Sequence, residues 1–298
     1  MKNLFLILFV FSISVTAVAQ VDTLELRELE VSATTIRQTP IGSPNQTWSS
    51  ETLQQLPARN IAELLTNETG VFIKNYGAGS LATSSIRGGS ASHTLVLWNG
   101  LPVQSPMLGQ LDLSLLPSNF VENVSVEYGG NTSMWGSGSI GGTISLNNQV
   151  DFTNRFSTAS QTSFGSFDYF NQQFKVNVGN DRFQSSTKIG QQQAKNDFEY
   201  SIREDLPLRI QTNAEFFQRN ILQDFYYKIT PKQQFATHFW YQTSNRQIPP
   251  TINQNRSVAH QSDEAFRLMM DWNLRTLDNH PNKQNARKRP SLGLLPLR

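Results

Sequence analysis

The second half of the chain alternates between apolar and polar side chains with a period of two residues. In the clearest run, Phe235, Phe239 and Tyr241 share one face of an extended segment, and His238 and Gln242 share the other. Runs of about ten residues with one aromatic face are typical of membrane-spanning β-strands, although a secreted antiparallel sandwich also alternates. Residues 151–276 are therefore predicted to form antiparallel strands. Comparable alternation is seen at residues 174–178, 183–189, 225–229 and 266–274.

The first residues have the pattern of an export signal. Lys2 precedes an apolar run at residues 4–11, and small residues lead to Ala17-Val18-Ala19. This run is much shorter than the roughly 20 apolar residues that a membrane anchor needs. Residues 1–19 are therefore predicted to be a signal peptide, and a chain that spans a membrane would have to do so with strands.

Composition excludes several classes of protein. The chain of 298 residues contains no cysteine, which removes disulfide scaffolds and thiolate metal sites. Basic residues outnumber acids from Arg275 to the end, whereas the rest of the chain is net negative. Nucleic-acid binding needs a basic stripe within the fold, so no nucleic-acid partner is expected. The histidines show no metal-ligand spacing and no catalytic constellation is found, so the chain is not expected to be an enzyme.

Residues 41–150 mix short helical and strand signals. Asn60 is a good helix N-cap with Glu63 three positions later, and Gly70 is a plausible stop. Short β-prone runs separated by glycine and proline follow. The mixture predicts a compact α+β domain. The predicted strands are residues 71–73, 95–98, 124–128 and 143–146.

This stretch resembles the plug domain of TonB-dependent outer-membrane receptors, and within that family it is most similar to the cobalamin (vitamin B12) receptors. Each matching piece is weak alone, but together they occur in order behind a signal peptide and ahead of alternating strands. The pieces are Leu56–Leu65, Gly70-Val71, Ile86-Arg87-Gly88, Ala91–Leu97, Asn99-Gly100, Asp112–Pro117 and Trp135–Ile144.

The resemblance implies an α+β plug domain followed by a partial antiparallel outer-membrane β-barrel with an incomplete strand set. It implies a Gram-negative outer-membrane receptor for uptake of a scarce bulky ligand such as a corrinoid, with a ferric siderophore as the alternative. The implied partners are TonB with its ExbB/ExbD motor, outer-membrane lipid and the extracellular ligand. The expected segments are 1–19 signal peptide, 20–40 extension, 41–150 plug, 151–276 barrel strands and 277–298 basic tail.

Near the mature N-terminus, one segment resembles the TonB box, an extended stretch that adds a strand to the sheet of TonB. An ordinary first strand of the plug is the other interpretation, and Asp22–Leu26 is a rival location for the box. The expected TonB-binding residues are Leu29, Glu30, Val31, Ser32 and Ala33.

Loops at the outer tip of the plug are expected to line the ligand site, because glycine and small polar residues let backbone approach a bulky ligand. Arg87 is the candidate for a buried ion pair between plug and barrel. Two departures from the family pattern, Asn99 and Tyr128-Gly129-Gly130, imply that the contacts with the barrel wall differ here. The expected ligand-binding residues are Asn75, Tyr76, Gly77, Gly79, Ser80, Leu81, Thr83, Ser90 and Gln104, with residues 105–107 beside them.

Three weaker signals have simpler interpretations. Gly136, Gly138 and Gly141 match a dinucleotide-loop string, but the strand-like Thr143–Leu146 follows instead of a helix. No cofactor is expected. A calcium site in an outer loop is an alternative to a solvated acidic loop, although the EF-hand order is missing. The acids of that loop are Asp197, Glu199, Glu204 and Asp205.

The strand set looks truncated. About six strands are recognisable, whereas barrels that enclose a plug reach about 22 strands and eight strands enclose only side chains. An open, curved partial sheet beside the plug is therefore expected, followed by a disordered tail. A non-transporting exported plug remnant and a secreted carbohydrate-binding sandwich are the alternatives to an importer.

Overall fold

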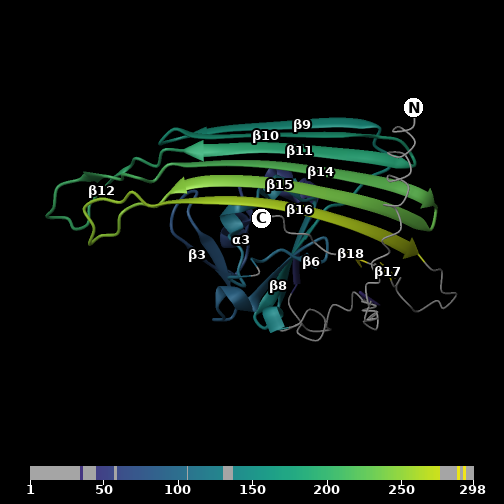
Figure 1. The fold of residues 1–298 in the computed structure, drawn as a ribbon, viewed down its shortest axis with the longest axis horizontal. Helices are drawn as coiled ribbons and strands as arrows, with labels where there is room; N and C mark the ends of the chain where they lie inside the picture. Colours follow the sequence, from purple (N-terminus) through teal and green to yellow (C-terminus); the bar gives the residue numbers. More distant parts are fainter. Residues whose placement is uncertain are drawn as a thin grey trace, which may run out of the picture. The chain divides into compact units, whose positions relative to one another are not determined.

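The computed structural model describes residues 45–275 apart from 57–58, 106 and 130–136, together with short strands at 34–35, 287–288 and 291–292. It contains an N-terminal domain and a long antiparallel sheet (Figure 1). Among the helices of the described residues, none is long and apolar enough to cross a membrane.

The N-terminal domain is built on a five-stranded sheet with the order β2-β7-β8-β5-β6, in which only the β5–β8 pair is parallel. A separate hairpin is formed by β3 and β4. The strands of the N-terminal domain are β2 (Asn45–Trp48), β3 (Phe72–Asn75), β4 (Ala82–Ser85), β5 (Thr94–Trp98), β6 (Leu101–Pro102), β7 (Asn123–Tyr128) and β8 (Gly142–Asn147). Its helices are α2 (Ser50–Gln55), α3 (Ile61–Glu68), η1 (Ala91–His93), η2 (Leu113–Leu115), η3 (Ser118–Phe120) and η4 (Ser137–Ser139).

Helix α3 begins where the sequence predicts. The side chain of Asn60 accepts a hydrogen bond from the backbone N–H of Glu63 at 3.0 Å, which satisfies a donor that the first turn leaves unpaired. The carboxylate of Glu63 accepts from the backbone N–H of Arg59 at 2.8 Å. The helix then buries its apolar residues, Leu64 and Leu65 among them, in the hydrophobic core of the domain.

Strand β8 follows the glycine-rich stretch directly, so the helix that a dinucleotide loop requires is not formed there. Gly142 begins this strand against β7. A Cβ atom at Gly142 would lie 2.5 Å from the carbonyl oxygen of Glu127, so only glycine fits this pairing.

The long sheet confirms the strands that alternation predicts. Antiparallel neighbours follow the order β16-β15-β14-β11-β10-β9, and β1, β17 and β18 add short pairs beyond β16. The sheet is not closed within the described residues. Its strands are β9 (Phe156–Gly165), β10 (Tyr169–Gly179), β11 (Phe183–Ala194), β14 (Phe216–Thr230), β15 (Gln233–Gln247) and β16 (His260–Arg275). The remaining strands are β1 (Thr34–Thr35), β12 (Glu199–Tyr200), β13 (Arg209–Ile210), β17 (Arg287–Lys288) and β18 (Ser291–Leu292).

The two faces of the long sheet are reversed relative to a water-soluble sandwich. Aromatic side chains such as Phe174, Tyr227 and Trp272 are 41–47% exposed on the outer face. Polar side chains such as Gln218 and Gln242 are buried on the inner face, against the N-terminal domain. A sandwich buries its apolar face, whereas a barrel in lipid exposes it. The arrangement therefore favours the barrel interpretation over the sandwich.

The connections at the two ends of the sheet differ in length. At one end, residues 180–182 and 231–232 make short turns, whereas the other end has long loops at residues 195–215 and 248–259 beside one short turn at residues 166–168. Outer-membrane barrels have short periplasmic turns and long extracellular loops. We therefore call the end with the long loops the outer end.

Candidate functional site

The β3–β4 hairpin brings together most of the residues that the sequence predicts at a ligand site. Asn75 Oδ1 accepts from the backbone N–H of Gly77 at 2.9 Å, and the N–H of Ser80 donates to the carbonyl of Gly77 at 3.1 Å. Gly77 and Gly79 have positive φ angles of 122° and 71°, which favour glycine. We call residues 75–81 the hairpin loop.

The hairpin loop meets the long sheet at its outer end. Asn196 Nδ2 donates to the carbonyl of Ala78 at 2.9 Å, and a Cβ atom at Gly79 would lie 2.2 Å from the ring of Phe216. The loop is thus held against the sheet, and Gly79 allows this close approach.

Three other predicted ligand residues make local contacts instead. Thr83 is buried in β4. Ser90 precedes η1, and its backbone N–H donates to Nδ1 of His93. The Ser90 hydroxyl is hydrogen-bonded to the hydroxyl of Ser92. Gln104 Nε2 donates to the carbonyl of Thr94 at 3.0 Å. Thr83 is thus buried and Ser90 and Gln104 are bonded within the plug-side segments, whereas the side chains of Asn75 and Tyr76 are exposed.

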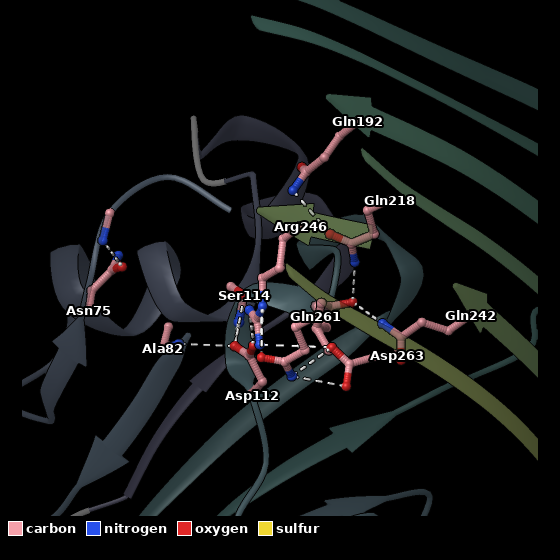
Figure 2. Close-up of polar contacts among 12 residues, drawn as sticks. Asn75, Ala82, Asp112, Ser114, Gln192, Gln218, Gln242, Arg246, Gln261 and Asp263 are labelled. Atoms are coloured by element: carbon pink, nitrogen blue, oxygen red, sulfur yellow. Dashed lines mark hydrogen bonds and ion pairs between the residues drawn. The ribbon is translucent and has the colours of Figure 1, made fainter. Parts of the chain in front are cut away.

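Asp112 joins three parts of the structure through one carboxylate (Figure 2). Its Oδ1 accepts hydrogen bonds from the backbone N–H of Ala82 at 3.0 Å and from the N–H and hydroxyl of Ser114 at 3.0 and 2.7 Å. Its Oδ2 accepts from Nη1 of Arg246 on β15 at 2.6 Å, and both side chains are buried. One residue therefore caps η2, holds the start of β4 and pairs with the sheet.

The backbone carbonyl of Leu115, three residues after Asp112, strengthens this attachment. Leu115 accepts hydrogen bonds from the side-chain amides of Gln218 on β14, at 2.7 Å, and Gln242 on β15. Sequence reasoning missed this anchor, although the Asp112-x-Ser114 pattern is a helix-capping signal. Arg246 and the two glutamines carry no signal of their own, because their partners depend on how the sheet docks.

A second attachment of the N-terminal domain to the long sheet is centred on Glu122, just before β7. Its Oε1 pairs with Nζ of Lys188 on β11 at 2.6 Å and with Nζ of Lys175 on β10 at 2.8 Å. Its Oε2 accepts from Asn148 Nδ2 at 3.1 Å. Lys188 is 1% exposed and also donates to the carbonyl of Phe120 at 2.8 Å. We call this group the Glu122 cluster.

Trp98 makes the apolar contact beside the Glu122 cluster. This last residue of β5 is fully buried, and its ring lies edge-on to Trp240, with ring centroids 5.2 Å apart. The ring of His238, which pairs with Asp224 at 2.7 Å, lies 5.9 Å away. Trp98 Nε1 donates to Asn148 Oδ1 at 2.8 Å, so the apolar and ionic contacts share one asparagine.

With this geometry in view, comparison with known proteins identifies the N-terminal part of the chain. Residues 37–143 match the family model described as TonB-dependent Receptor Plug Domain. This part of the chain is a TonB-dependent receptor plug domain. We call the N-terminal domain the plug from here on.

Curated relatives match over part of the chain. The Vitamin B12 transporter BtuB of Vibrio cholerae is 33% identical over 118 residues, which are 39% of this chain and 19% of the relative. That of Photobacterium profundum is 31% identical over 104 residues, 35% of this chain and 17% of the relative. The matched stretch thus spans less than a fifth of these relatives.

Solved structures match over both the plug and the long sheet. The copper transporter OprC superposes with a TM-score of 0.64 at 16% identity, over 78% of this chain and 35% of that one. The siderophore receptor PiuA from Acinetobacter baumannii gives 0.59 at 15% identity, over 80% and 34%. At such identities the likeness shows the fold alone, a plug docked on an antiparallel sheet that is part of a barrel wall.

The structure corrects the expectation for Arg87. Arg87 is exposed in a turn with φ 53°, and no salt bridge between described residues includes it. The plug instead presents carboxylates, Glu122 and Asp112, to cations on the sheet.

The acids named for the alternative of a calcium site do not gather into a group. Although Asp197, Glu199, Glu204 and Asp205 all belong to the described loop, no group of three or more potential metal ligands gathers anywhere in the described parts of the chain. Asp205 pairs with Arg203 instead.

The TonB-box segment Leu29–Ala33 and its rival Asp22–Leu26 lie outside the described residues, as do the signal peptide and most of the basic tail. Their expected roles remain predictions.

The net pKa shift of Glu122 gives the Glu122 cluster a pH dependence. Burial raises the pKa of this carboxyl, but the charges of Lys188 and Lys175 outweigh burial and hold the pKa below its ordinary value of 4.5. A carboxyl with a depressed folded-state pKa stabilises the fold above its unfolded-state pKa, and this contribution is lost as pH falls through the folded-state value.

We therefore expect the free energy of unfolding to fall as the pH drops below about 4.5. Chemical denaturation of the detergent-solubilised chain, followed by tryptophan fluorescence from pH 6 down to about 3, measures this. Glu122→Gln, which has no charge to lose, should have a flatter profile. If the free energy of unfolding varied with pH in the same way in the wild type and in Glu122→Gln, the assignment of this pH dependence to Glu122 would be contradicted.

Proposed function

We propose that the chain provides the plug and part of the wall of a TonB-dependent outer-membrane receptor that takes up a bulky, scarce ligand from outside the cell. The observation that carries the proposal is the plug held on the polar inner face of a sheet whose outer face is apolar. In this proposal residues 1–19 direct export, 20–40 hold the TonB box, 41–150 form the plug and 151–276 are wall strands. Residues 277–298 are a basic tail, of which β17 and β18 make short pairs with β16.

A corrinoid such as cobalamin is the ligand class that the similarity favours. The relatives with about one third identity are vitamin B12 transporters, whereas the siderophore receptors resemble the chain in fold alone. The hairpin loop suits a large ligand, because its exposed backbone and small side chains permit close approach. A ferric siderophore is the second candidate.

Energy for uptake would come from TonB and its ExbB/ExbD motor. In the proposal, Leu29, Glu30, Val31, Ser32 and Ala33 form an extended segment that pairs with the sheet of TonB through backbone hydrogen bonds. Because these bonds come from the main chain, proline is the substitution that tests them best. It removes an N–H donor and fixes φ.

Val31→Pro, introduced at the chromosomal locus, is expected to reduce uptake of radiolabelled cyanocobalamin at least about tenfold while binding at the cell surface persists. Leu24→Pro is the matched control in the rival segment and should leave uptake unchanged. Normal uptake by Val31→Pro cells would refute the assignment of the box.

Surface binding in the same cells tests the ligand class. Excess unlabelled cyanocobalamin should displace the label, and ferripyoverdine should not. Absence of cyanocobalamin binding together with binding of the ferric siderophore would replace the corrinoid by the second candidate.

A further inference from the structure

Arg246 stands between two carboxylates. Its Nη1 lies 2.6 Å from Asp112 Oδ2 on the plug, and its Nη2 lies 3.8 Å from Asp263 Oδ2 on β16. Asp263 is about one third exposed and accepts two hydrogen bonds from Gln261, whereas Asp112 is buried (Figure 2). The guanidinium therefore has a second, partly solvated acid within reach if it leaves the plug.

The plug-side acid is bonded directly to the hairpin. Asp112 Oδ1 accepts from the N–H of Ala82, the first residue of β4 and the residue that follows the hairpin loop. The carbonyl of Leu81 also accepts from the N–H of Tyr76 across the loop. A displacement of the hairpin loop is therefore a displacement of a hydrogen-bond donor to Asp112.

The hairpin touches the wall at the neighbour of Arg246. Gly79 packs on Phe216 of β14, and Phe216 is the cross-strand partner of Arg246 on β15. Contact of the loop with Phe216 and the pair of Asp112 with Arg246 therefore occur at one level of the sheet. Any ligand that moves the loop away from the wall acts on both.

We propose that Asp112 and Arg246 form a latch that couples the position of the hairpin loop to the attachment of the plug, with Asp263 as the alternative partner of Arg246. The inference rests on the proposed function, in which ligand binds at the hairpin loop. Loss of the Ala82 bond weakens the hold of Asp112, and Arg246 turns to Asp263 without becoming an unpaired buried charge. Asp112 and Arg246 are positioning residues, and neither needs to touch the ligand.

The first test uses the ligand-free chain in outer-membrane vesicles. Arg246→Gln is expected to accelerate amide hydrogen exchange of peptides covering 76–82 about tenfold, because Asp112 is then free to release Ala82. Arg246 makes no hydrogen bond to this segment in the described structure, so a merely local role would not alter its exchange. Arg219→Gln, on the exposed outer face of β14, is the matched control and should change nothing.

Asp263→Asn distinguishes a latch with two positions from a simple anchor. With the alternative partner neutralised, Arg246 should stay with Asp112, and exchange of 76–82 should be slower, whereas a simple anchor leaves it unchanged. Unaltered exchange in Arg246→Gln, or unaltered or faster exchange in Asp263→Asn, would overturn the proposal.

A second arm adds cyanocobalamin as the probe. Binding should accelerate exchange at residues 112–117 in the wild type, and the acceleration should disappear in Asp112→Asn, where exchange is already fast. If cyanocobalamin does not bind, the corrinoid assignment fails while the ligand-free comparison still decides the latch. If it binds and exchange at 112–117 is unaffected, the latch is overturned and the receptor function stands.

Discussion

Replacing Glu122 by glutamine is expected to lower the free energy of unfolding at neutral pH by about 3–5 kcal/mol. Glutamine keeps the shape of the side chain but leaves Lys188 buried without its carboxylate partner at 2.6 Å. Asp224 is already paired with His238, so it offers no full replacement. Urea denaturation of the detergent-solubilised chain, with tryptophan fluorescence as the signal, measures the loss.

The matched variant removes the other member of the pair as well. Glu122→Gln combined with Lys188→Met should recover most of the lost stability, because replacing both partners of a buried ion pair leaves no buried charge to compensate. Lys175 is 22% exposed and can turn to solvent. A double variant no more stable than the single one would show that the charge pair is not what Glu122 contributes.

Replacing Trp98 by alanine is expected to cost about 3–5 kcal/mol, the range for deleting a large buried aromatic side chain. The substitution opens a cavity against Trp240 and leaves Asn148 Oδ1 without the indole N–H at 2.8 Å. Because Asn148 also bonds Glu122, the loss should spread into the Glu122 cluster. The same denaturation experiment reports it.

Phe72→Ala is the control for this prediction. Phe72 is an aromatic residue of the same domain, but it is 65% exposed, so its removal should change stability by less than about 0.5 kcal/mol. If Trp98→Ala and Phe72→Ala lowered the free energy of unfolding equally, the number of aromatic residues, rather than the contact of Trp98 with the sheet, would govern stability.

Local sequence patterns predicted much of the fold. Alternation around Phe235–Tyr241 predicts a strand whatever its neighbours are, and Asn60 with Glu63 predicts the start of α3 from one turn of helix. Both signals depend on residues close together in sequence.

The docking contacts between plug and sheet could not be predicted in the same way. Glu122 and Lys188 are far apart in the chain, and which wall residue faces which plug residue depends on the register and placement of the sheet. Arg87 shows the cost of relying on a motif, since the family pattern suggested burial and the turn places it in solvent. Asp112 appeared only as part of a family motif, because its partner Arg246 lies on β15, far away in the sequence.

The position of β2 determines how the plug responds to a mechanical load. This strand lies at the edge of the small sheet and pairs only with β7, antiparallel, from Asn45 opposite Glu127 to Trp48 opposite Val124. Tension at its N-terminal end that acts across the strand opens this ladder from that end, so the hydrogen bonds bear the load one after another. Peeling in this way needs little force and meets its first strong resistance at Trp48, the one buried side chain of the strand. The first part of the plug to yield is therefore its edge, while the attachments at Asp112 and Glu122 are still intact.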